Sequence, residues 1–252
     1  MIQLSVNVNK IATLRNSRGG DIPDLISHVK LILEAGAHGI TVHPRSDERH
    51  ITHKDVRDIK KFLIEYNQTT HNKVEFNIEG ELSDRFLDIV LENKPDQATL
   101  VPVSPGEITS DHGFNFITDK SFLLKYLPKI KNAGIRTSVF VETDLENLSK
   151  IKEIQTDRVE FYTGPFAVEY SKGNGISSFE TYKKAALLVS EFGIEINAGH
   201  DLDHINMKVF RNLPGLKEVS IGHRLISHSL QIGLKSTIHE YLKTLAGENG
   251  TD

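Results

Sequence analysis

The stretch GITVHPRSDERH, residues 39–50, runs from four strand-like residues into a cluster of two histidines, two arginines and two acids. Folding alone gives no reason for an apolar run to end in so many titratable side chains. The pattern is typical of a buried strand whose end opens into a polar pocket. We therefore expect other strands of the protein to deliver polar residues to the same place.

Short β-branched runs alternate with amphipathic helical segments along the whole chain. Strands are expected over residues 3–8, 39–43, 73–79, 97–103, 136–142, 158–163, 194–199 and 216–221. Helices are expected over 24–37, 53–66, 83–94, 120–133, 145–154, 178–192, 204–213 and 228–245. Eight such units with mostly short connections predict the α/β class and, within it, a parallel (β/α)8 TIM barrel. A short helical insert over 11–19 follows the first strand.

A doubly wound open sheet is the main alternative fold, but no Gly-x-Gly-x-x-Gly follows the first strand. The chain has no linker-like composition between its elements. We therefore expect one TIM-barrel domain over residues 1–252.

The composition restricts the classes of function. A formal charge of −4 argues against nonspecific nucleic-acid binding, which needs a basic face. The sequence contains no run of about 18 apolar residues, so no membrane contact is expected. It contains no cysteine, which excludes disulfides and thiolate metal sites and fits a cytoplasmic protein.

Polar residues gather at the predicted strand ends, which is where TIM barrels carry their chemistry. They are Asn7 and Asn9, His43 and Arg45, Glu75, Asn77 and Glu79, Glu160 and Thr163, Asn197 and His200, and Gly222 and His223. A lone buried histidine or glutamate is more often structural than catalytic. The convergence of six histidines and acids on one barrel mouth favours an active site instead.

Three segments are candidates for binding phosphate or closing over it. Arg15 and Arg18 lie beside Gly19-Gly20, where backbone N–H groups and a guanidinium can meet an anion, although a solvated surface loop explains them equally well. Small-residue turns at 197–200 and 221–223 occupy the usual phosphate position of this fold. The loop 104–113 has the composition of a mobile lid, with a functionless loop as the competing interpretation.

A catalytic metal is not expected. His43 and His50 with Glu75 or His200 offer nitrogen and oxygen ligands for zinc in principle. However, the sequence contains no His-x-His or His-Glu-x-x-His spacing, and the neighbouring arginines would repel a cation.

At these residues the chain resembles the pyridoxine 5′-phosphate synthase family. The resemblance is carried by NVNKIATLRNSRG at 7–19, GITVHPR at 39–45, RHI at 49–51, LVP at 100–102, NAGH at 197–200 and IGH at 221–223. It extends from about Leu4 to the final helix. It implies a TIM barrel assembled as a homo-octamer, and an enzyme that needs no cofactor. The implied reaction condenses 3-amino-2-oxopropyl phosphate with 1-deoxy-D-xylulose 5-phosphate to pyridoxine 5′-phosphate, phosphate and water.

The resemblance also implies roles for single residues. His43 corresponds to an acid/base, Glu75 to a base, His200 to a proton donor and Glu160 to an assisting glutamate. Such groups suit the reaction, because the amine must attack a ketone as the free base and later steps each move protons.

The substrate-binding residues are implied in the same way. Those for the amino-ketone phosphate are Asn7, Arg18, Gly222 and His223, and those for the deoxyxylulose phosphate are Arg45, His50 and Thr109. Asn9-Lys10 stands where the family has Asp-His and contacts the deoxyxylulose phosphate. Asp201 stands where a glycine follows the strand-seven histidine, and it adds negative charge beside a phosphate position. Pro44 replaces a leucine and stiffens its turn.

Two other functions fit the same sequence features. One is another phosphosugar isomerase or aldolase, although aldolases of this fold often need a lysine inside the barrel and the strands offer no convincing one. The other is a non-catalytic barrel that binds a phosphate ligand, which the residues at Asn9, Lys10 and Asp201 motivate.

Overall fold

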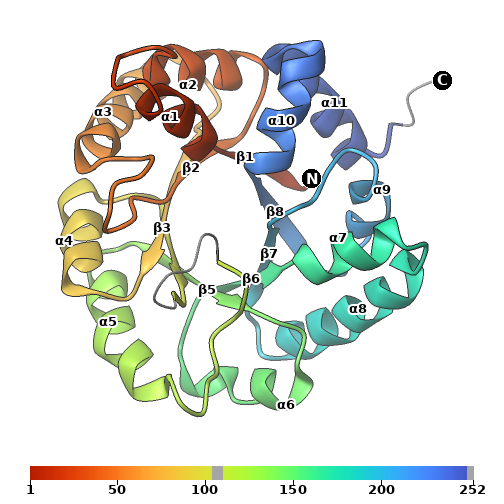
Figure 1. Cartoon of the computed structure of the whole chain (residues 1–252). Coiled ribbons are helices and arrows are strands. Elements are labelled where there is room, and N and C mark those ends of the chain that lie inside the picture. The colour runs from red at the N-terminus through yellow and green to blue at the C-terminus, as the bar shows by residue number, and fades with distance from the viewer. Residues whose placement is uncertain (104–109, 249–252) are drawn as a thin grey trace.

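The protein is a closed eight-stranded parallel barrel surrounded by helices, as a computed structural model describes it for residues 1–103 and 110–248 (Figure 1). The strands are β1 (Gln3–Asn7), β2 (Gly39–Val42), β3 (Glu75–Glu81), β4 (Gln97–Val101), β5 (Arg136–Val141), β6 (Arg158–Tyr162), β7 (Glu195–Gly199) and β8 (Leu216–Ile221). Each strand pairs with the next in the sequence, and β8 pairs with β1 to close the barrel. The predicted TIM barrel is confirmed.

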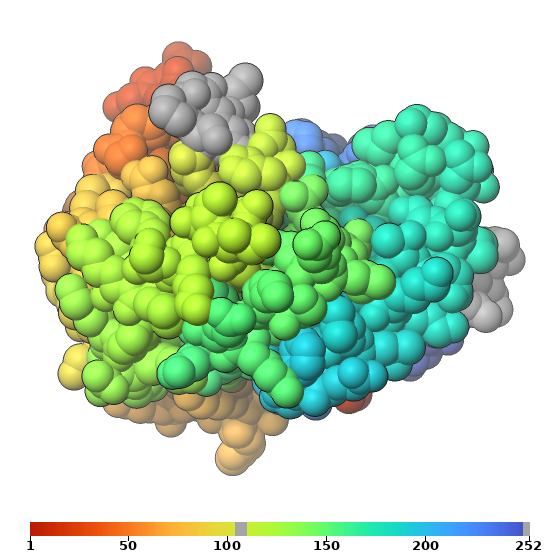
Figure 2. Space-filling model, turned by 90° about the horizontal axis from the view of Figure 1, so that it is seen from below, coloured from red at the N-terminus to blue at the C-terminus, as the bar shows by residue number. Residues whose placement is uncertain are grey.

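Helices cover the outside of the barrel (Figures 1 and 2). They are α1 (Asn9–Asn16), α2 (Leu25–Glu34), α3 (His53–Thr69), α4 (Asp84–Asn93), α5 (Lys120–Asn132), α6 (Leu145–Leu148), α7 (Gly164–Ser171), α8 (Gly175–Glu191), α9 (Met207–Phe210), α10 (His223–Ile232) and α11 (Leu234–Ala246). Figure 2 shows the side wall that runs from α5, in yellow-green, to α8, in turquoise. No helix in the described ranges is both long and apolar enough to cross a membrane.

The apolar core lies between the strands and the helices. All residues of β2 and β4 are buried, as expected for strands covered on both faces. Side-chain caps fix the starts of several helices. The Ser83 hydroxyl accepts a hydrogen bond from the N–H of Phe86 at 3.1 Å and caps the start of α4. Thr52 and Asp55 form a capping box at the start of α3.

Several boundaries differ from the sequence prediction; for example, the insert expected over 11–19 is α1 (Asn9–Asn16), and the helix expected over 204–213 is only α9 (Met207–Phe210). β3 begins and ends two residues later than expected. The connection after β6 contains the unpredicted helix α7, and the expected helix over 145–154 is only α6 followed by a 3-10 turn at Ile151–Glu153. The C-terminal tail is two helices, because Gly233 takes a φ of 85° that ends α10 and begins α11.

The N-terminal end of the barrel interior is filled by an ion-pair network. Arg136 pairs with Glu75, and its Nε donates to Gln97 Oε1 at 2.9 Å. Arg158 Nη1 donates to the same Gln97 oxygen at 3.2 Å and to Glu218 Oε2 at 3.1 Å. Burial raises the pKa of Glu218 to about 7. The network closes this end of the barrel, so the open end lies at the C-terminal edge of the strands.

Candidate active site

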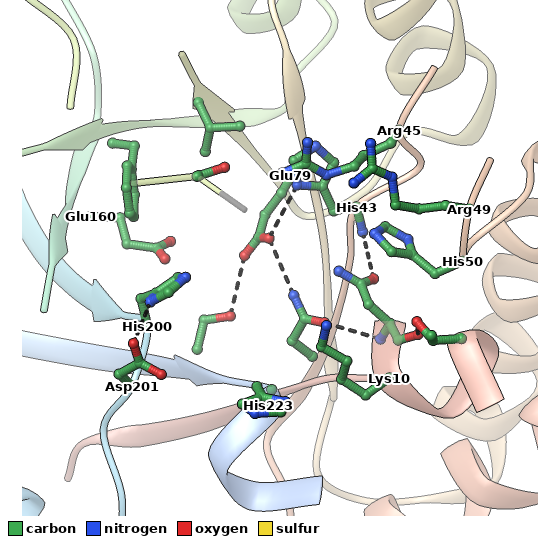
Figure 3. Close-up of a pocket in the computed structure, with 18 residues that line it drawn as sticks. Lys10, His43, Arg45, Arg49, His50, Glu79, Glu160, His200, Asp201 and His223 are labelled. Carbon is green, nitrogen blue, oxygen red and sulfur yellow. Dashed lines mark hydrogen bonds and ion pairs between the residues drawn. The ribbon is translucent and has the colours of Figure 1, made fainter. Parts of the chain in front are cut away.

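A cavity of about 340 Å³ opens at the C-terminal ends of the strands (Figure 3). We call this cavity the mouth. Its polar lining includes Asn7, Asn9, Lys10, Thr13, His43, Arg45, Arg49, His50, Glu79, Ser110, Glu160, His200, Asp201, Ser220 and His223. These side chains come from strands, loops and α1 around the barrel, so most of the polar residues predicted at the strand ends do converge on one mouth. Glu75, Asn77, Thr163 and Asn197 do not line it.

Glu79, near the end of β3, is the central carboxyl of the mouth. Its side chain is only 13% exposed, and it accepts hydrogen bonds from Asn7 Nδ2 at 3.2 Å and from Ser220 Oγ at 3.4 Å. Burial raises the pKa of Glu79 to about 7 against the lowering effect of the Ser220 hydrogen bond. A carboxyl with this pKa can both accept and release a proton near neutrality.

His43 faces Glu79 from the end of β2. Its Nδ1 lies 3.9 Å from Glu79 Oε2, and its backbone N–H donates to Asn9 Oδ1 at 3.0 Å. Burial, with the positive charge of Arg45, lowers the pKa of His43 well below its usual value. The imidazole is therefore neutral at pH 7, and its contact with Glu79 is not an ion pair. One neutral base and one carboxyl of raised pKa stand side by side.

Glu160 places a second buried carboxyl in the mouth, from β6. Burial and the nearby charge of Glu79 raise its pKa well above the usual value. Its Oε2 atom has no hydrogen-bond partner among the described residues. Gly199 on the adjacent strand β7 makes room for this side chain, because a Cβ there would overlap Glu160 Oε1. Burial thus favours the protonated form of Glu160, and its Oε2 is left without a hydrogen-bond partner among the described residues.

His200 and Asp201 follow β7 on the opposite side of the mouth. Both have left-handed backbones, with φ values of 81° and 56°, which cost conformational energy for residues other than glycine. His200 Nδ1 lies 3.1 Å from Asp201 Oδ2, and the imidazole packs edge-on against Tyr162 at 5.2 Å. The hydrogen bond with His200 lowers the pKa of Asp201, and Arg224 Nε lies 3.6 Å from its other oxygen. The charge of Asp201 therefore lies next to compensating groups.

Arg45, His50 and Lys10 gather at the β1–β2 side of the mouth. Burial, followed by the charge of Arg45, lowers the pKa of His50 to about 4. His50 Nδ1 accepts a hydrogen bond from the N–H of Ile51 at 2.9 Å, so the neutral ring carries its proton on Nε2. His50 can therefore donate one hydrogen bond to an anion without being charged itself.

The N-terminus of α10 reaches the mouth beside β1. Its first residues, Gly222 and His223, line the cavity. A Cβ at Gly222 would lie 3.0 Å from the Cβ of Asn7, so glycine permits this close approach. The unpaired N–H groups of a helix N-terminus favour anions. The mouth thus has two sides whose groups favour an anion, with candidate acid/base groups between them.

Several predicted site residues lie elsewhere. Glu75, expected as a catalytic base, is the first residue of β3 and pairs with Arg136 in the closed end of the barrel. Glu75 and Glu79 point into the same interior but lie four residues apart, or roughly 13 Å along the strand. The assignment of Glu75 to the mouth is therefore wrong. The register shows the signal that identifies Glu79, because Val42 pairs with Ile78 and so His43 is level with Glu79.

The two arginines of the insert do not line the mouth. Arg18 is exposed after the end of α1. Arg15 instead forms a bidentate pair with Asp55, at 2.7 and 2.9 Å. Thr109 and the segment 104–109 lie outside the described residues, and so does most of the predicted lid. Sequence reasoning also gave no role to Ser220 or Arg49, which line the mouth.

The fold and this site together define a class, a TIM-barrel protein whose mouth combines buried titratable groups with cationic side chains and a helix N-terminus. Residues 4–247 match the family described as "Pyridoxal phosphate biosynthesis protein PdxJ", and the chain belongs to that family. A relative from Leptospira biflexa is 54% identical over 260 residues, covering 100% of both chains. One from Flavobacterium johnsoniae is 49% identical, covering 97% of this chain and 100% of the relative. Both are named pyridoxine 5′-phosphate synthase.

Solved structures of similar shape agree on the barrel. Phosphoribosyl anthranilate isomerase from Thermotoga maritima has a TM-score of 0.57 and 10% identity, covering 98% of this chain and 100% of that one. Thiamine phosphate pyrophosphorylase from Pyrococcus furiosus has a TM-score of 0.59 and 13% identity, covering 99% and 97%. At this level of identity the likeness shows the fold alone.

Proposed function

We propose that this chain is a pyridoxine 5′-phosphate synthase that condenses 3-amino-2-oxopropyl phosphate with 1-deoxy-D-xylulose 5-phosphate, releasing phosphate and water. The observation that carries the proposal is the pairing of Glu79, with a pKa of about 7, and neutral His43 between two anion-binding sides. Family membership and the names of the relatives support the same activity. Two phosphorylated substrates need two anion sites, and their condensation needs proton transfer between them.

Glu79 acts as the general base in this proposal, in place of Glu75. Its carboxylate takes a proton from the reacting amine or from carbon, and Asn7 and Ser220 hold its two oxygens in place. His43, 3.9 Å away, exchanges protons with the same substrate atoms as a neutral imidazole. These two groups suit Schiff-base formation and the later elimination of phosphate, which each need a proton removed and another supplied.

His200 and Glu160 supply protons from the other side of the mouth. Asp201 orients the His200 imidazole through the 3.1 Å contact with Nδ1, so that the ring can supply a proton to a leaving hydroxyl. Glu160, whose pKa is raised by burial, donates a hydrogen bond through Oε2, which has no partner among the described residues. Acids on one side and bases on the other allow dehydration and ring closure without movement of the substrate.

The two phosphates are assigned to the two anion-binding sides. The deoxyxylulose phosphate binds Arg45, His50 Nε2 and Lys10, with Asn9 holding the backbone of His43. The amino-ketone phosphate binds at the N-terminus of α10, beside Asn7 and His223. Arg18 has no contact with either site in this assignment. A single domain and an octameric assembly complete the proposal, and the reaction as written requires no metal or redox cofactor.

Incubating the purified protein with both substrates tests this function. We expect pyridoxine 5′-phosphate and inorganic phosphate in equal amounts, and neither when one substrate is omitted. Phosphate or a rearranged sugar from a single substrate would favour an isomerase or aldolase. Binding of the substrates without any product would favour a non-catalytic barrel, and either result would contradict the proposal.

A further inference from the structure

A second cluster of metal-binding side chains lies outside the mouth, where α9, α10 and α11 adjoin (Figure 1). His204 precedes α9, His228 lies in α10 and Glu240 lies in α11. One ligand atom from each residue lies within 4.8 Å of the ligand atoms of the other two. None of the three lines the mouth, so the proposed reaction does not account for their convergence.

The two histidines share one carboxylate. His228 Nε2 lies 2.6 Å from Glu240 Oε2, and His204 Nε2 lies 3.9 Å from Glu240 Oε1. The two imidazole rings stack, with centroids 4.4 Å apart and planes 16° apart. The stacked rings present their Nε2 atoms to the same carboxylate. A neutral imidazole is the form that binds metals.

Hydrogen bonds do not explain the orientation of His204. Its Nδ1 atom is buried and has no hydrogen-bond partner in the described part of the chain. Its Nε2 atom lies beyond hydrogen-bond distance from Glu240. The buried Nδ1 is unusual in this respect, because buried polar groups are normally satisfied. A cation held between the rings and the carboxylate would give Nε2 its missing partner.

The ligand spacing fits a small tetrahedral ion. Two ligands each about 2.0–2.1 Å from such an ion are roughly 3.3 Å apart. The observed separations of 2.6 and 3.9 Å lie on either side of this value. Two imidazoles and one carboxylate suit Zn²⁺ and its transition-metal neighbours, whereas Mg²⁺ and Ca²⁺ prefer oxygen ligands alone. The three side chains are 23%, 18% and 39% exposed, which leaves access for the ion and for a water ligand.

We propose that His204, His228 and Glu240 form a binding site for a divalent transition-metal ion, with Zn²⁺ as the best fit. The ion ties the β7–α9 connection to the α10–α11 pair. His204 follows the mouth residue His200 by four positions, and His228 follows His223 by five. The ion therefore has a structural role, because it links helical segments that adjoin the mouth. It takes no part in the proposed reaction.

The charges around the cluster are compatible with a cation. Near Tyr241, the side chains of Asp203 and Glu240 contribute negative charge and that of Arg224 contributes positive charge. Arg224 in turn lies 3.6 Å from Asp201, which offsets its charge. The carboxylate of Glu240 thus remains available to balance a bound ion.

Calorimetric titration of EDTA-treated and dialysed full-length protein with Zn²⁺ tests the site. We expect one ion per chain, with affinity at least tenfold weaker in His228→Ala and in Glu240→Gln. His53→Ala is the matched control, since His53 Nε2 pairs with Glu92 at 2.7 Å but the pair belongs to no trio of ligands among the described residues. That variant should keep the wild-type affinity within twofold.

Anomalous scattering at the zinc edge, from wild-type crystals soaked in Zn²⁺, locates the ion without relying on any variant to fold. An ion between His204, His228 and Glu240 is the expected result. No binding by the wild type at micromolar Zn²⁺, unchanged affinity in both folded site variants, or an ion bound only elsewhere would overturn the proposal.

Discussion

Glu79 and His43 have pKa values moved in opposite directions by one cause, their burial in the mouth. Removal from water disfavours the charged form of either group, so it raises the pKa of the acid and lowers that of the base. The two side chains therefore do not form an ion pair at rest, although His43 Nδ1 and Glu79 Oε2 lie only 3.9 Å apart. Such a pair can move a proton to or from a substrate without first breaking an ion pair.

The pH dependence of the reaction reports the protonation state of the Glu79 carboxyl. A general base must be deprotonated, so its active fraction rises as the pH increases through its pKa of about 7. We expect kcat/KM to rise with pH below about 7 and to level above it. Glu160 interacts with Glu79, so the midpoint is an apparent value for the pair. A midpoint near 4.5 would contradict the raised pKa.

The variant Ser220→Ala tests whether the rising limb of the kcat/KM profile comes from Glu79 or from ionisation of the substrates. The Ser220 hydroxyl donates to Glu79 and lowers its pKa, so its removal should move the limb to higher pH. The pKa values of the substrates do not depend on the variant. A limb that stays in place in Ser220→Ala profiles would assign it to the substrates instead.

At the scale of elements, α1 holds the segment that carries the anion-binding residues Arg45 and His50. Arg15 pairs with Asp55 at the start of α3, and Asn16 Nδ2 donates to the carbonyl oxygen of His50 at 2.8 Å. The Arg15 and Asp55 side chains are only 15% and 10% exposed. The insert after β1, helix α1, thus has a positioning role: it holds the loop after β2 against α3.

Loss of this clamp should weaken substrate binding more than chemistry. In Arg15→Gln, Asp55 loses both guanidinium hydrogen bonds, at a cost to stability of about 2 kcal/mol. We expect KM for the deoxyxylulose phosphate to rise about tenfold, with kcat reduced less than threefold. Urea denaturation and steady-state kinetics measure the two effects.

Arg18→Gln is the control, because Arg18 is exposed and does not line the mouth. Its stability and KM should match the wild type. A rise in KM in this variant equal to that in Arg15→Gln would restore the role of Arg18 that the sequence alone suggested.

The elements show where sequence reasoning reaches its limit. The alternation of strand-like and helical segments predicts the eight strands. The polar residues at the strand ends predict most of the side chains that line the mouth. The sequence does not separate Glu75 from Glu79 as the base of β3, since the two positions lie four residues apart on the same interior face and both are glutamates. Only the pairing with β2, a long-range contact, sets which of the two is level with His43.

Other differences between the expected and the observed elements have local causes that the sequence pattern does not show. The turn Thr163-Gly164-Pro165 reads as a loop, yet proline is favoured in the first helical turn and begins α7 there. Gly233 inside an amphipathic stretch looks tolerable, but its positive φ divides the tail into two helices. Arg15 and Arg18 have the same surroundings in sequence, and only packing against α3 separates them.

On the scale of the whole molecule, the barrel has two polar ends with different purposes. At the closed end, acids and bases pair with each other, as Arg158 does with Glu218 at 3.1 Å. At the open end, the described acids Glu79 and Glu160 have no such cationic partner within hydrogen-bond distance and keep raised pKa values instead. Both ends contain glutamates and arginines, so the distinction between these residues comes from topology and register.

The assembly gives a prediction on the same scale. The family resemblance implies an octamer, so light scattering should give a particle of eight times the 28.3 kDa chain mass. Measurement across a hundredfold range of protein concentration shows whether the particle is stable. A monomer or dimer at every concentration would contradict the octamer and leave the mouth assignment unaffected.

The claim that chemistry occurs at Glu79, and not at Glu75, is tested most directly by comparing kcat in two variants. Glu79→Gln and Glu75→Gln change the same residue type on the same interior face of β3. The first should lower kcat at least a thousandfold while the fold and substrate binding are retained. The second should lose stability, by about 1–3 kcal/mol through its broken pair with Arg136, but keep kcat within threefold of the wild type. Full turnover by Glu79→Gln, or loss of turnover in a folded Glu75→Gln, would contradict the account.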